Sequence, residues 1–302
     1  MKQELSILIP VYNTICTQLV LLLADQCRSI AQADKLFRYE IIVADDASTC
    51  KECLEANAAI NDLDDCRYVV KPTNTGSAAT RNYLASIARY DWLMFLDSDM
   101  QIPSPRFVHT YLNQEAGGVI NGGVSIAPFD RHNLRYLYEK ACEPAHTPEQ
   151  RARRPYQSFR SANFLIQREA MLRCPFDERF TRSGYEDVML GKQLHSNDIP
   201  VHHIDNPVSM TDFEPNVEYM DKIDRSLATL CRFRQELRGY SRLITIDEGI
   251  HLKAVRGAVR LWQRLAGPLI RRILCSRHPC LKLFNLYRIG YYISLTKNDS
   301  QL

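Results

Sequence analysis

Three short apolar segments, Leu5–Ile9, Tyr39–Ala44 and Trp92–Leu96, each end in polar, turn-forming residues. Continuous apolar runs of this length are typical of strands buried on both faces. The two intervening segments, residues 17–33 and 51–60, have apolar positions at helical spacing and contain no Pro or Gly. This alternation of strands and helices predicts an α/β fold with right-handed crossovers and a largely parallel sheet.

Carboxylates follow two of these strands. Asp46 comes after the second strand, and Asp97 and Asp99 come after the third, with only Ser98 between them. Because open α/β sheets hold ligands at the carboxyl ends of their strands, Asp46 and Asp99 should meet at one rim. Asp97 and Asp99 would repel each other unless a hard cation such as Mg²⁺ or Mn²⁺, with its phosphate ligands, lies between them. The alternative is an ordinary polar turn, with Asp46 and Ser48 capping the next helix.

Five segments in one order carry a family resemblance. They are Ser6–Asn13, Val43–Ser48, Asn74–Asn82, Phe95–Asp99 and Gly184–Gly191, which span roughly the first two thirds of the chain. In this order they resemble the family 2 glycosyltransferases, inverting enzymes of the GT-A fold that use nucleotide sugars. The resemblance implies a GT-A type, Rossmann-like, mainly parallel sheet flanked by helices, here with a C-terminal helical extension.

The resemblance gives the donor-side residues specific roles. It implies that Pro10, Tyr12 and Asp46 hold the uracil of a UDP-sugar, and a carboxylate is a suitable acceptor for the imide N–H of uracil. Arg81 would lie beside the ribose and diphosphate, near a helix N-terminus that favours anions. The alternative is that Arg81 only braces Asp46 or Asp97 in a salt bridge. Asp99 would bind the metal ion, with Asp97 on the ribose or on a metal-bound water.

The pair Glu186 and Asp187 supplies the expected catalytic group. By resemblance, Asp187 is the general base that takes the proton of the acceptor hydroxyl, which then attacks the anomeric carbon opposite UDP and inverts its configuration. Adjacent carboxylates disfavour double ionisation, which raises one pKa and improves a base. The alternative is that both are first-turn helix residues favoured by the helix dipole.

The chain departs from the family pattern at one position. In relatives a histidine usually follows the Asn-Pro-Val segment and completes the metal or diphosphate site, but here Met210 stands in its place. A thioether is a poor ligand for a hard cation. One alternative is that His202, His203 or Asp212 replaces the missing histidine. The other is that each of the three is an ordinary strand or surface residue. This departure motivates a second hypothesis, a nucleotide-sugar-binding protein with little or no turnover.

The region between these motifs leaves three alternatives open. Gly122 and Gly123 interrupt a predicted strand over 119–126, which indicates a bulge or a close backbone approach to the donor. Asn163, on a predicted strand over 160–166, either hydrogen-bonds a sugar hydroxyl or marks a bulge. The basic residues 151–154 either close over the diphosphate or form a solvated loop.

Composition agrees with one large catalytic domain and a smaller appendage. The 302 residues, 45% hydrophobic and 24% charged, suffice for a full core. We predict a catalytic domain over 1–215, with a donor half at about 1–100 and an acceptor half at about 101–215, and a helical extension over 216–302. The net charge of +3 gives no reason to expect nucleic acid. The 10 cysteines have no zinc-site spacing and fit reduced thiols. No glycine- and lysine-rich loop follows the first strand, which argues against a nucleotidyltransferase.

The chain from Lys253 onward is basic and amphipathic. Arginines interrupt every apolar run before the roughly 18 residues that a membrane span needs. The spacing suits a helix that lies on an anionic membrane surface, or equally one that packs on the catalytic domain. Without a recognisable secretory signal, we expect a cytoplasmic enzyme of polysaccharide biosynthesis, peripheral to a membrane that displays a glycan or lipid-linked saccharide acceptor.

Overall fold

The core of the protein is a seven-stranded sheet. The structure is a computed structural model that describes residues 1–181 and 184–296. The strand order is β3-β2-β1-β4-β8-β6-β9. The bounds are β1 Glu4–Val11, β2 Arg38–Asp45, β3 Cys66–Val70, β4 Trp92–Leu96, β6 Val119–Asn121, β8 Asn163–Gln167 and β9 Val201–His203. β8 runs antiparallel to both of its neighbours, and the other neighbouring pairs are parallel. The prediction of a mainly parallel α/β sheet is therefore confirmed.

Helices cover both faces of this sheet. Their bounds are α1 Thr17–Ala33, α2 Lys51–Ala58, the 3₁₀ turn η1 Ala59–Asp62, α3 Ser77–Ile87, α4 Phe107–Leu112, α7 Arg168–Arg173 and α8 Glu186–Ser196. Within β1, Ile7 and Ile9 pack into the cluster that includes α1 and α4, whereas Leu8 packs into the cluster that includes α3 and α8. All three are fully buried. Burial of one such side chain contributes roughly 1.5–3 kcal/mol to stability. Because β1 buries side chains on both faces, it stabilises the packing of both helix layers on the sheet.

A second, three-stranded sheet stands beside the first. It contains β5 Met100–Gln101, β10 Val208–Met210 and β7 Val124–Ile126, in that order. The predicted strand over 119–126 is thus two strands in two sheets, and Gly122 and Gly123 make the crossing between them. Gly123 has φ +86°, and a Cβ on Gly122 would lie 2.3 Å from the Asn206 carbonyl oxygen. Only glycine fits this crossing without strain.

The turn before α3 is built on a glycine. The N-cap is Gly76, with φ 89°, and Ser77 is the first helical residue. A Cβ on Gly76 would lie 2.7 Å from the carbonyl oxygen of Thr181. The N–H groups of Thr75 and Gly76, just before the helix, donate to the carboxylate of Asp46.

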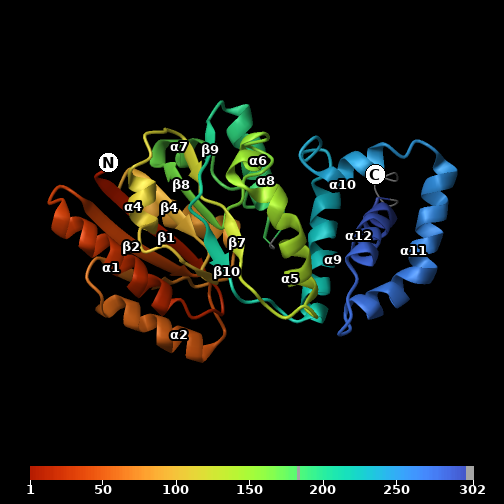
Figure 1. Cartoon of the computed structure of the whole chain (residues 1–302), viewed down its shortest axis with the longest axis horizontal. Coiled ribbons are helices and arrows are strands. Elements are labelled where there is room, and N and C mark those ends of the chain that lie inside the picture. Colours follow the sequence, from red (N-terminus) through yellow and green to blue (C-terminus); the bar gives the residue numbers. More distant parts are fainter. Residues whose placement is uncertain (182–183, 297–302) are drawn as a thin grey trace.

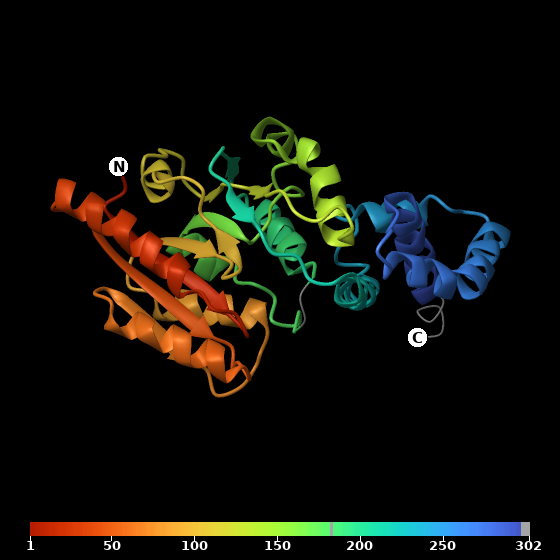
Figure 2. The same cartoon turned by 60° about the horizontal axis from the view of Figure 1, so that its bottom comes forward.

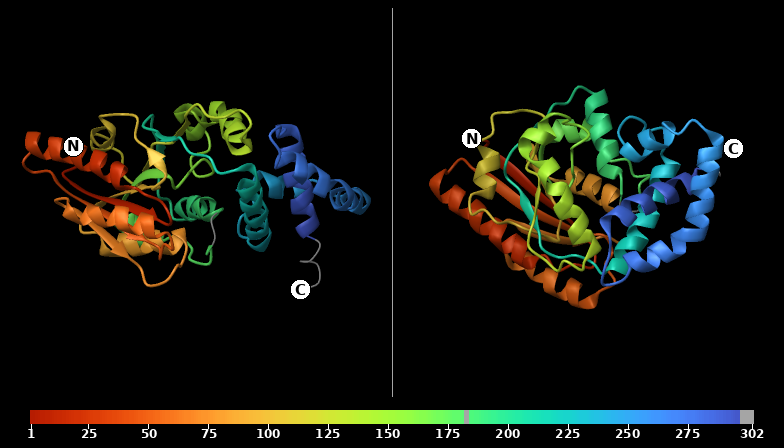
Figure 3. Two further views of the ribbon diagram at one scale, coloured as in Figure 1. Left: turned by 90° about the horizontal axis from the view of Figure 1, so that it is seen from below. Right: turned by 45° about the vertical axis from the view of Figure 1, so that its right-hand side comes forward.

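The C-terminal part of the chain is helical, as predicted, and contains α9 Asn216–Arg232, α10 Arg242–Glu248, α11 Lys253–Leu274 and α12 Leu281–Leu295. Three further elements lie in the middle of the chain: α5 Leu134–Cys142, η2 Glu143–His146 and α6 Pro148–Ala152. Figure 1 shows α10, α11 and α12 at one end of the molecule, with α9 between them and the rest of the chain, and Figures 2 and 3 keep this order. α9 also packs on α5 through Tyr219, Met220 and Leu134. The division into domains at residue 215 stays a prediction.

Helix α11 packs on its neighbours with one face and turns another to solvent. Ile270 and Leu274 are buried in the cluster with α9 and α12. Leu261, Leu265 and Leu269 are 58%, 72% and 61% exposed. Among the described residues no helix has both the length and the apolar character needed to cross a membrane.

Candidate active site

A cleft of about 520 Å³ lies at the carboxyl ends of β1, β2 and β4. The donor-side residues, the Asp97–Asp99 pair and the two acids of the expected catalytic group all line it: Pro10, Tyr12, Asp46, Arg81, Asp97, Asp99, Glu186 and Asp187. They come from five separate parts of the chain. The volume falls within the usual range for small-molecule sites.

Asn13 joins the two loops that carry the predicted base-binding residues. It has φ 52°, a left-handed conformation that asparagine tolerates. Its side-chain Oδ1 accepts from the N–H groups of Thr49 and Cys50 at 2.8 and 2.9 Å, and its own N–H donates to Ser48 Oγ at 2.7 Å. The loop after β1 is therefore fixed to the start of α2, while Tyr12 beside it is 48% exposed.

Asp46 anchors the turn that leads into α3. Lys71 Nζ and the Thr75 N–H donate to its Oδ1 at 2.7 and 3.0 Å, and the Gly76 N–H donates to Oδ2 at 2.7 Å. Burial opposes ionisation, but these hydrogen bonds keep the pKa of the Asp46 carboxyl below its ordinary value. Oδ2 accepts from one donor, so it retains capacity for a further N–H. Structural anchoring and base binding are compatible here.

Arg81 is the buried centre of the cleft. Its Nη2 donates to Asp97 Oδ1 at 2.6 Å, and Nη1 lies 3.8 Å from Glu186 Oε1. The guanidinium also lies over the ring of Phe176, 5.2 Å from its centroid. Nε and Nη1 are buried and have no hydrogen-bond partner. Of the two salt bridges considered for Arg81, the structure contains the one with Asp97 and none with Asp46.

Asp97 and Asp99 directly follow the carboxyl end of β4. The side chain of Asp99 reaches solvent within the cleft, where loss of hydration first and the charge of Asp97 second raise the pKa of the Asp99 carboxyl. The ion pair with Arg81 offsets the charge of Asp97, whereas Asp99 has no ion-pair partner among the described residues. The described residues contain no cluster of three or more His, Cys, Asp or Glu side chains that could hold a metal ion. An ion here would therefore take most of its ligands from substrate and water.

Glu186 and Asp187 begin α8. The Glu186 Oε2 accepts from the Gly184 N–H at 2.8 Å, and Tyr185 at the N-cap has φ 70°. Both acids occupy the first helical turn, as the dipole interpretation requires, and this position is compatible with the catalytic one. Desolvation by burial, followed by the charge of Glu186, raises the pKa of Asp187 to about 7. A carboxyl that titrates near neutral pH is suited to general-base work.

Met210 lies in the same cleft. It pairs with Met100 across β10 and β5, and both line the cleft beside Asp99. The other candidates for the missing histidine lie elsewhere. His203 Nδ1 is 2.9 Å from Arg151 Nη1, His202 is exposed on the edge strand β9, and neither lines the cleft. Asp212 lines a neighbouring groove instead.

Two side chains of the intermediate region, Arg151 and Asn163, are buried, whereas Arg153 and Arg154 are exposed. Arg151 does not lie in an open loop, because it is 4% exposed and its guanidinium donates to the carbonyls of Asn121, Gly122 and Ile204. Asn163 is 1% exposed, and its Nδ2 donates to the carbonyls of Gly123 and Asn206. Both side chains therefore stabilise the backbone where the chain crosses from one sheet to the other at Gly122 and Gly123.

Sequence reasoning missed the wall that faces Asp99 and Asp187. It contains Arg135 and Glu139 of α5, Arg160 before β8, and Lys222 of α9. Arg135 and Glu139 are four residues apart and so share one helix face, a signal that is readable only after the helix is assigned. Arg160 pairs with Glu139 at 3.3 Å, and Lys222 pairs with Glu214 at 3.4 Å. Arg135 also pairs with Glu214.

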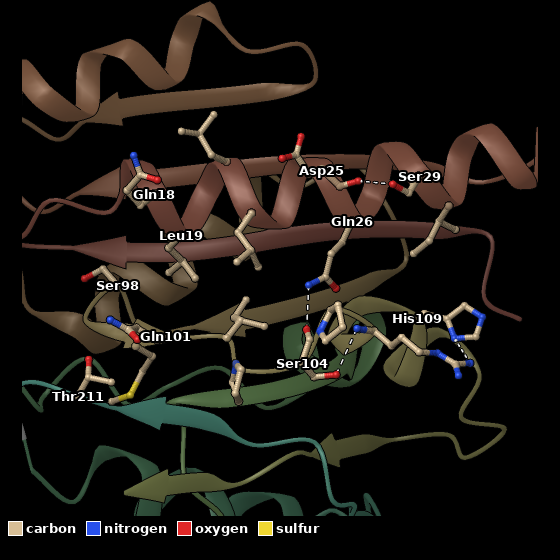
Figure 4. A pocket seen from close by; sticks show the side chains of 18 of the residues that line it. Gln18, Leu19, Asp25, Gln26, Ser29, Ser98, Gln101, Ser104, His109 and Thr211 are labelled. Atoms are coloured by element: carbon tan, nitrogen blue, oxygen red, sulfur yellow. Dashed lines mark hydrogen bonds between the residues drawn. The ribbon is translucent and has the colours of Figure 1, made fainter. Parts of the chain in front are cut away.

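A larger groove of about 1330 Å³ adjoins the cleft (Figure 4). It lies between α1 and the segment 98–109, and Gln26 Nε2 crosses it to donate to the Ser104 carbonyl at 3.0 Å. It shares only Thr14 and residues 98–100 with the cleft, so Asp99 is the single predicted site residue that faces both.

Comparison with known proteins decides the family. The sequence model of Glycosyl transferase family 2 matches residues 6–179, more than half of the chain. The protein belongs to this family. It is therefore a glycosyltransferase, and the predicted resemblance is confirmed. No curated protein matches the chain in sequence.

Solved structures share the fold. A mannosyltransferase from Pyrobaculum calidifontis is similar with a TM-score of 0.55 and 13% identity, covering 100% of this chain and 88% of that one. The TarS 1–349 structure from S. aureus has a TM-score of 0.51 and 15% identity, covering 100% and 92%. Glucosyl-3-phosphoglycerate synthase from Mycobacterium tuberculosis has a TM-score of 0.51 and 19% identity, covering 76% and 79%. The predicted GT-A type architecture is confirmed.

Proposed function

We propose that this glycosyltransferase transfers a sugar from a UDP-sugar to a hydroxyl of a glycan or lipid-linked glycan, with metal assistance and inversion at the anomeric carbon. The observation that carries the proposal is that one cleft contains the donor-side residues and, at Asp187, a carboxyl whose pKa is raised to about 7. The Mycobacterium enzyme of similar fold was solved with Mn²⁺ and UDP, which supports this donor class.

The donor would occupy the side of the cleft nearest β1 and β2. Pro10 and the exposed ring of Tyr12 border the base, and Asp46 Oδ2 accepts its imide N–H. Asn13 keeps the two loops at a fixed separation. Arg81 lines this side of the cleft beside Asp97, and its positive charge would lie near the ribose and the diphosphate.

Asp97 and Asp99 fit a divalent ion that arrives with the nucleotide. Mg²⁺ in phosphate sites commonly takes one or two protein carboxylates and completes its shell with phosphate and water oxygens. Such an ion would neutralise charge on the departing diphosphate. The two residues offer carboxylate oxygens on one turn, and Asp99 is the better exposed of the two.

Asp187 performs the proton transfer. The acceptor oxygen forms a bond to the anomeric carbon as the bond to the diphosphate breaks, and its electron pair leaves with UDP. Asp187 takes the hydroxyl proton, while Glu186 lies 3.8 Å from Arg81. One displacement of this kind needs no protein nucleophile and inverts the configuration.

UDP release from a panel of UDP-sugars tests the proposal. We expect cation-dependent release from one donor, inhibited by EDTA and lost in Asp187→Asn with acceptor present. UDP binding without turnover on any donor, across a broad acceptor set, would favour the alternative that Met210 motivates, a nucleotide-sugar-binding protein.

The outer face of α11 supports peripheral membrane contact on the cytoplasmic side. Leu261, Leu265 and Leu269 form its exposed apolar stripe, and Arg264 and Arg272 are exposed on the same helix. An apolar stripe bordered by cations suits the boundary between acyl chains and anionic headgroups. The stripe would hold the enzyme where a lipid-linked acceptor is displayed.

A further inference from the structure

The proposed donor brings a diphosphate, whose negative charge the cleft must balance. Met210 lines the cleft and brings no charge to it. Asp97 is already paired with Arg81 at 2.6 Å. The described residues offer no third metal-binding side chain near Asp99. As the bond to the sugar breaks, negative charge develops on the diphosphate, and stabilisation of that charge governs the rate.

The opposite wall carries two cations that share one carboxylate. Arg135 of α5 and Lys222 of α9 both pair with Glu214, which lies on the segment between β10 and α9. Two positive charges and one negative charge leave the cluster with a net charge of +1. Both cations line the cleft together with Asp99.

The two side chains differ in exposure in a way that suits an anion. The side chain of Arg135 is 14% exposed and is held by Glu214, so its guanidinium is fixed in place. The side chain of Lys222 is 41% exposed, and its 3.4 Å contact with Glu214 is long for an ion pair. An arginine presents a rigid fork to phosphate, whereas a lysine acts as a movable point charge.

We propose that Arg135 and Lys222 bind the diphosphate of the nucleotide sugar and stabilise the leaving UDP. This inference rests on the proposed function, and it adds residues from α5 and α9. Lys222 lies outside the segment that matches the family model and outside the five segments that carry the resemblance.

The test is calorimetric binding of UDP and of uridine, each with and without Mn²⁺. The variants are Lys222→Met and Arg135→Gln, which keep most of the side-chain volume. We expect each to weaken UDP binding about tenfold or more and to leave uridine binding unchanged, because a charged contact to phosphate is lost and the base contacts remain.

Lys140→Met is the matched control. Lys140 lies on α5, pairs with Glu143 at 2.6 Å, and does not line the cleft. This variant should bind UDP as the wild type does. Arg135→Lys tests the positioning role, because it should restore part of the UDP affinity that Arg135→Gln loses.

The outcomes separate the two proposals. A wild-type protein that binds no UDP would contradict the proposed function itself. A wild type that binds UDP, with equal affinity in Lys222→Met and Arg135→Gln, would overturn the diphosphate inference alone. An unchanged UDP affinity together with a raised acceptor KM would overturn it too, and would assign the wall to an anionic acceptor.

Discussion

Arg81 and Asp97 form an ion pair of 2.6 Å at the centre of the cleft, and the same guanidinium lies 3.8 Å from Glu186. One buried arginine therefore connects the predicted donor side with the helix that carries the predicted base. The side chain of Arg81 is only 4% exposed. Its positive charge permits the carboxyl groups of Asp97, Glu186 and Asp187 to lie close together.

Replacement of Arg81 by Met should destabilise the protein. The change leaves Asp97 and Glu186 without their cation, and a loss of about 3 kcal/mol in the free energy of unfolding is expected. Urea denaturation measures it. The double variant Arg81→Met/Asp97→Asn should recover part of the loss, since one uncompensated charge is removed. A double variant whose loss equals the sum of the two single losses would contradict this account.

The transfer rate should rise with pH through about 7. Asp187 must be ionised to accept a proton, and its pKa is raised to about 7 by burial and by Glu186. Initial rates between pH 5 and 9 at saturating substrate measure the effect. In Asp187→Asn we expect a loss of at least about a thousandfold, within the range attributed to general bases. A flat profile with retained activity would show that another group is the base.

The raised pKa of Asp187 also predicts how the free energy of unfolding changes with pH. The folded pKa of Asp187 lies above its unfolded value, so the folded state binds the proton more tightly. As pH rises from about 4 to about 7, the free energy of unfolding loses this contribution. Asp187→Asn should therefore raise Tm at pH 8, and the gain should vanish near pH 4. An equal Tm difference at both pH values would contradict the assignment.

Asn13 should control nucleotide affinity through the two loops that it joins. Asn13→Gly retains the left-handed backbone but loses the acceptor for the Thr49 and Cys50 N–H groups. We expect about 1 kcal/mol less stability, as for a lost helix cap, and weaker UDP binding. Asn13→Asp keeps an acceptor oxygen and serves as the control. Equal UDP affinity in both variants would show that the loops need no such link.

Gly122 should be the least tolerant glycine of the crossing. A Cβ there would lie 2.3 Å from both the Asn206 carbonyl oxygen and the Tyr111 hydroxyl. Gly122→Ala should cost roughly 3 kcal/mol, the upper end for overpacking. Gly257→Ala on α11 meets open space and should be neutral or stabilising by up to about 1 kcal/mol. Chemical denaturation compares the two, and similar costs would contradict the packing argument.

The exposed stripe of α11 should govern vesicle binding. Leu265→Glu/Leu269→Glu places two charges on it and should abolish cosedimentation with anionic vesicles. Leu172→Glu is the control, because Leu172 is 57% exposed on α7, a helix that packs on the sheet. If the double variant and the control bind vesicles equally, the stripe has another role, such as contact with a second copy of the chain.

The apolar runs and their polar ends determined much of this protein. Leu5–Ile9, Tyr39–Ala44 and Trp92–Leu96 predicted β1, β2 and β4, because a strand buried on both faces has a continuous apolar sequence. Since the carboxyl ends of parallel strands share one rim, Asp46 and Asp99 had to lie in one cleft. Local patterns of this kind are encoded within a few consecutive residues.

Only the tertiary structure decided which long-range partners each side chain has. Arg151 looked like part of a basic loop, yet it is buried among carbonyl oxygens of β6 and the segment after β9. Arg135 and Lys222 are 87 positions apart, and they share Glu214 only because α5 and α9 pack together. The outward turn of Leu265 likewise depends on which face of α11 packs on α12. Such contacts join distant parts of the chain, so no local pattern records them.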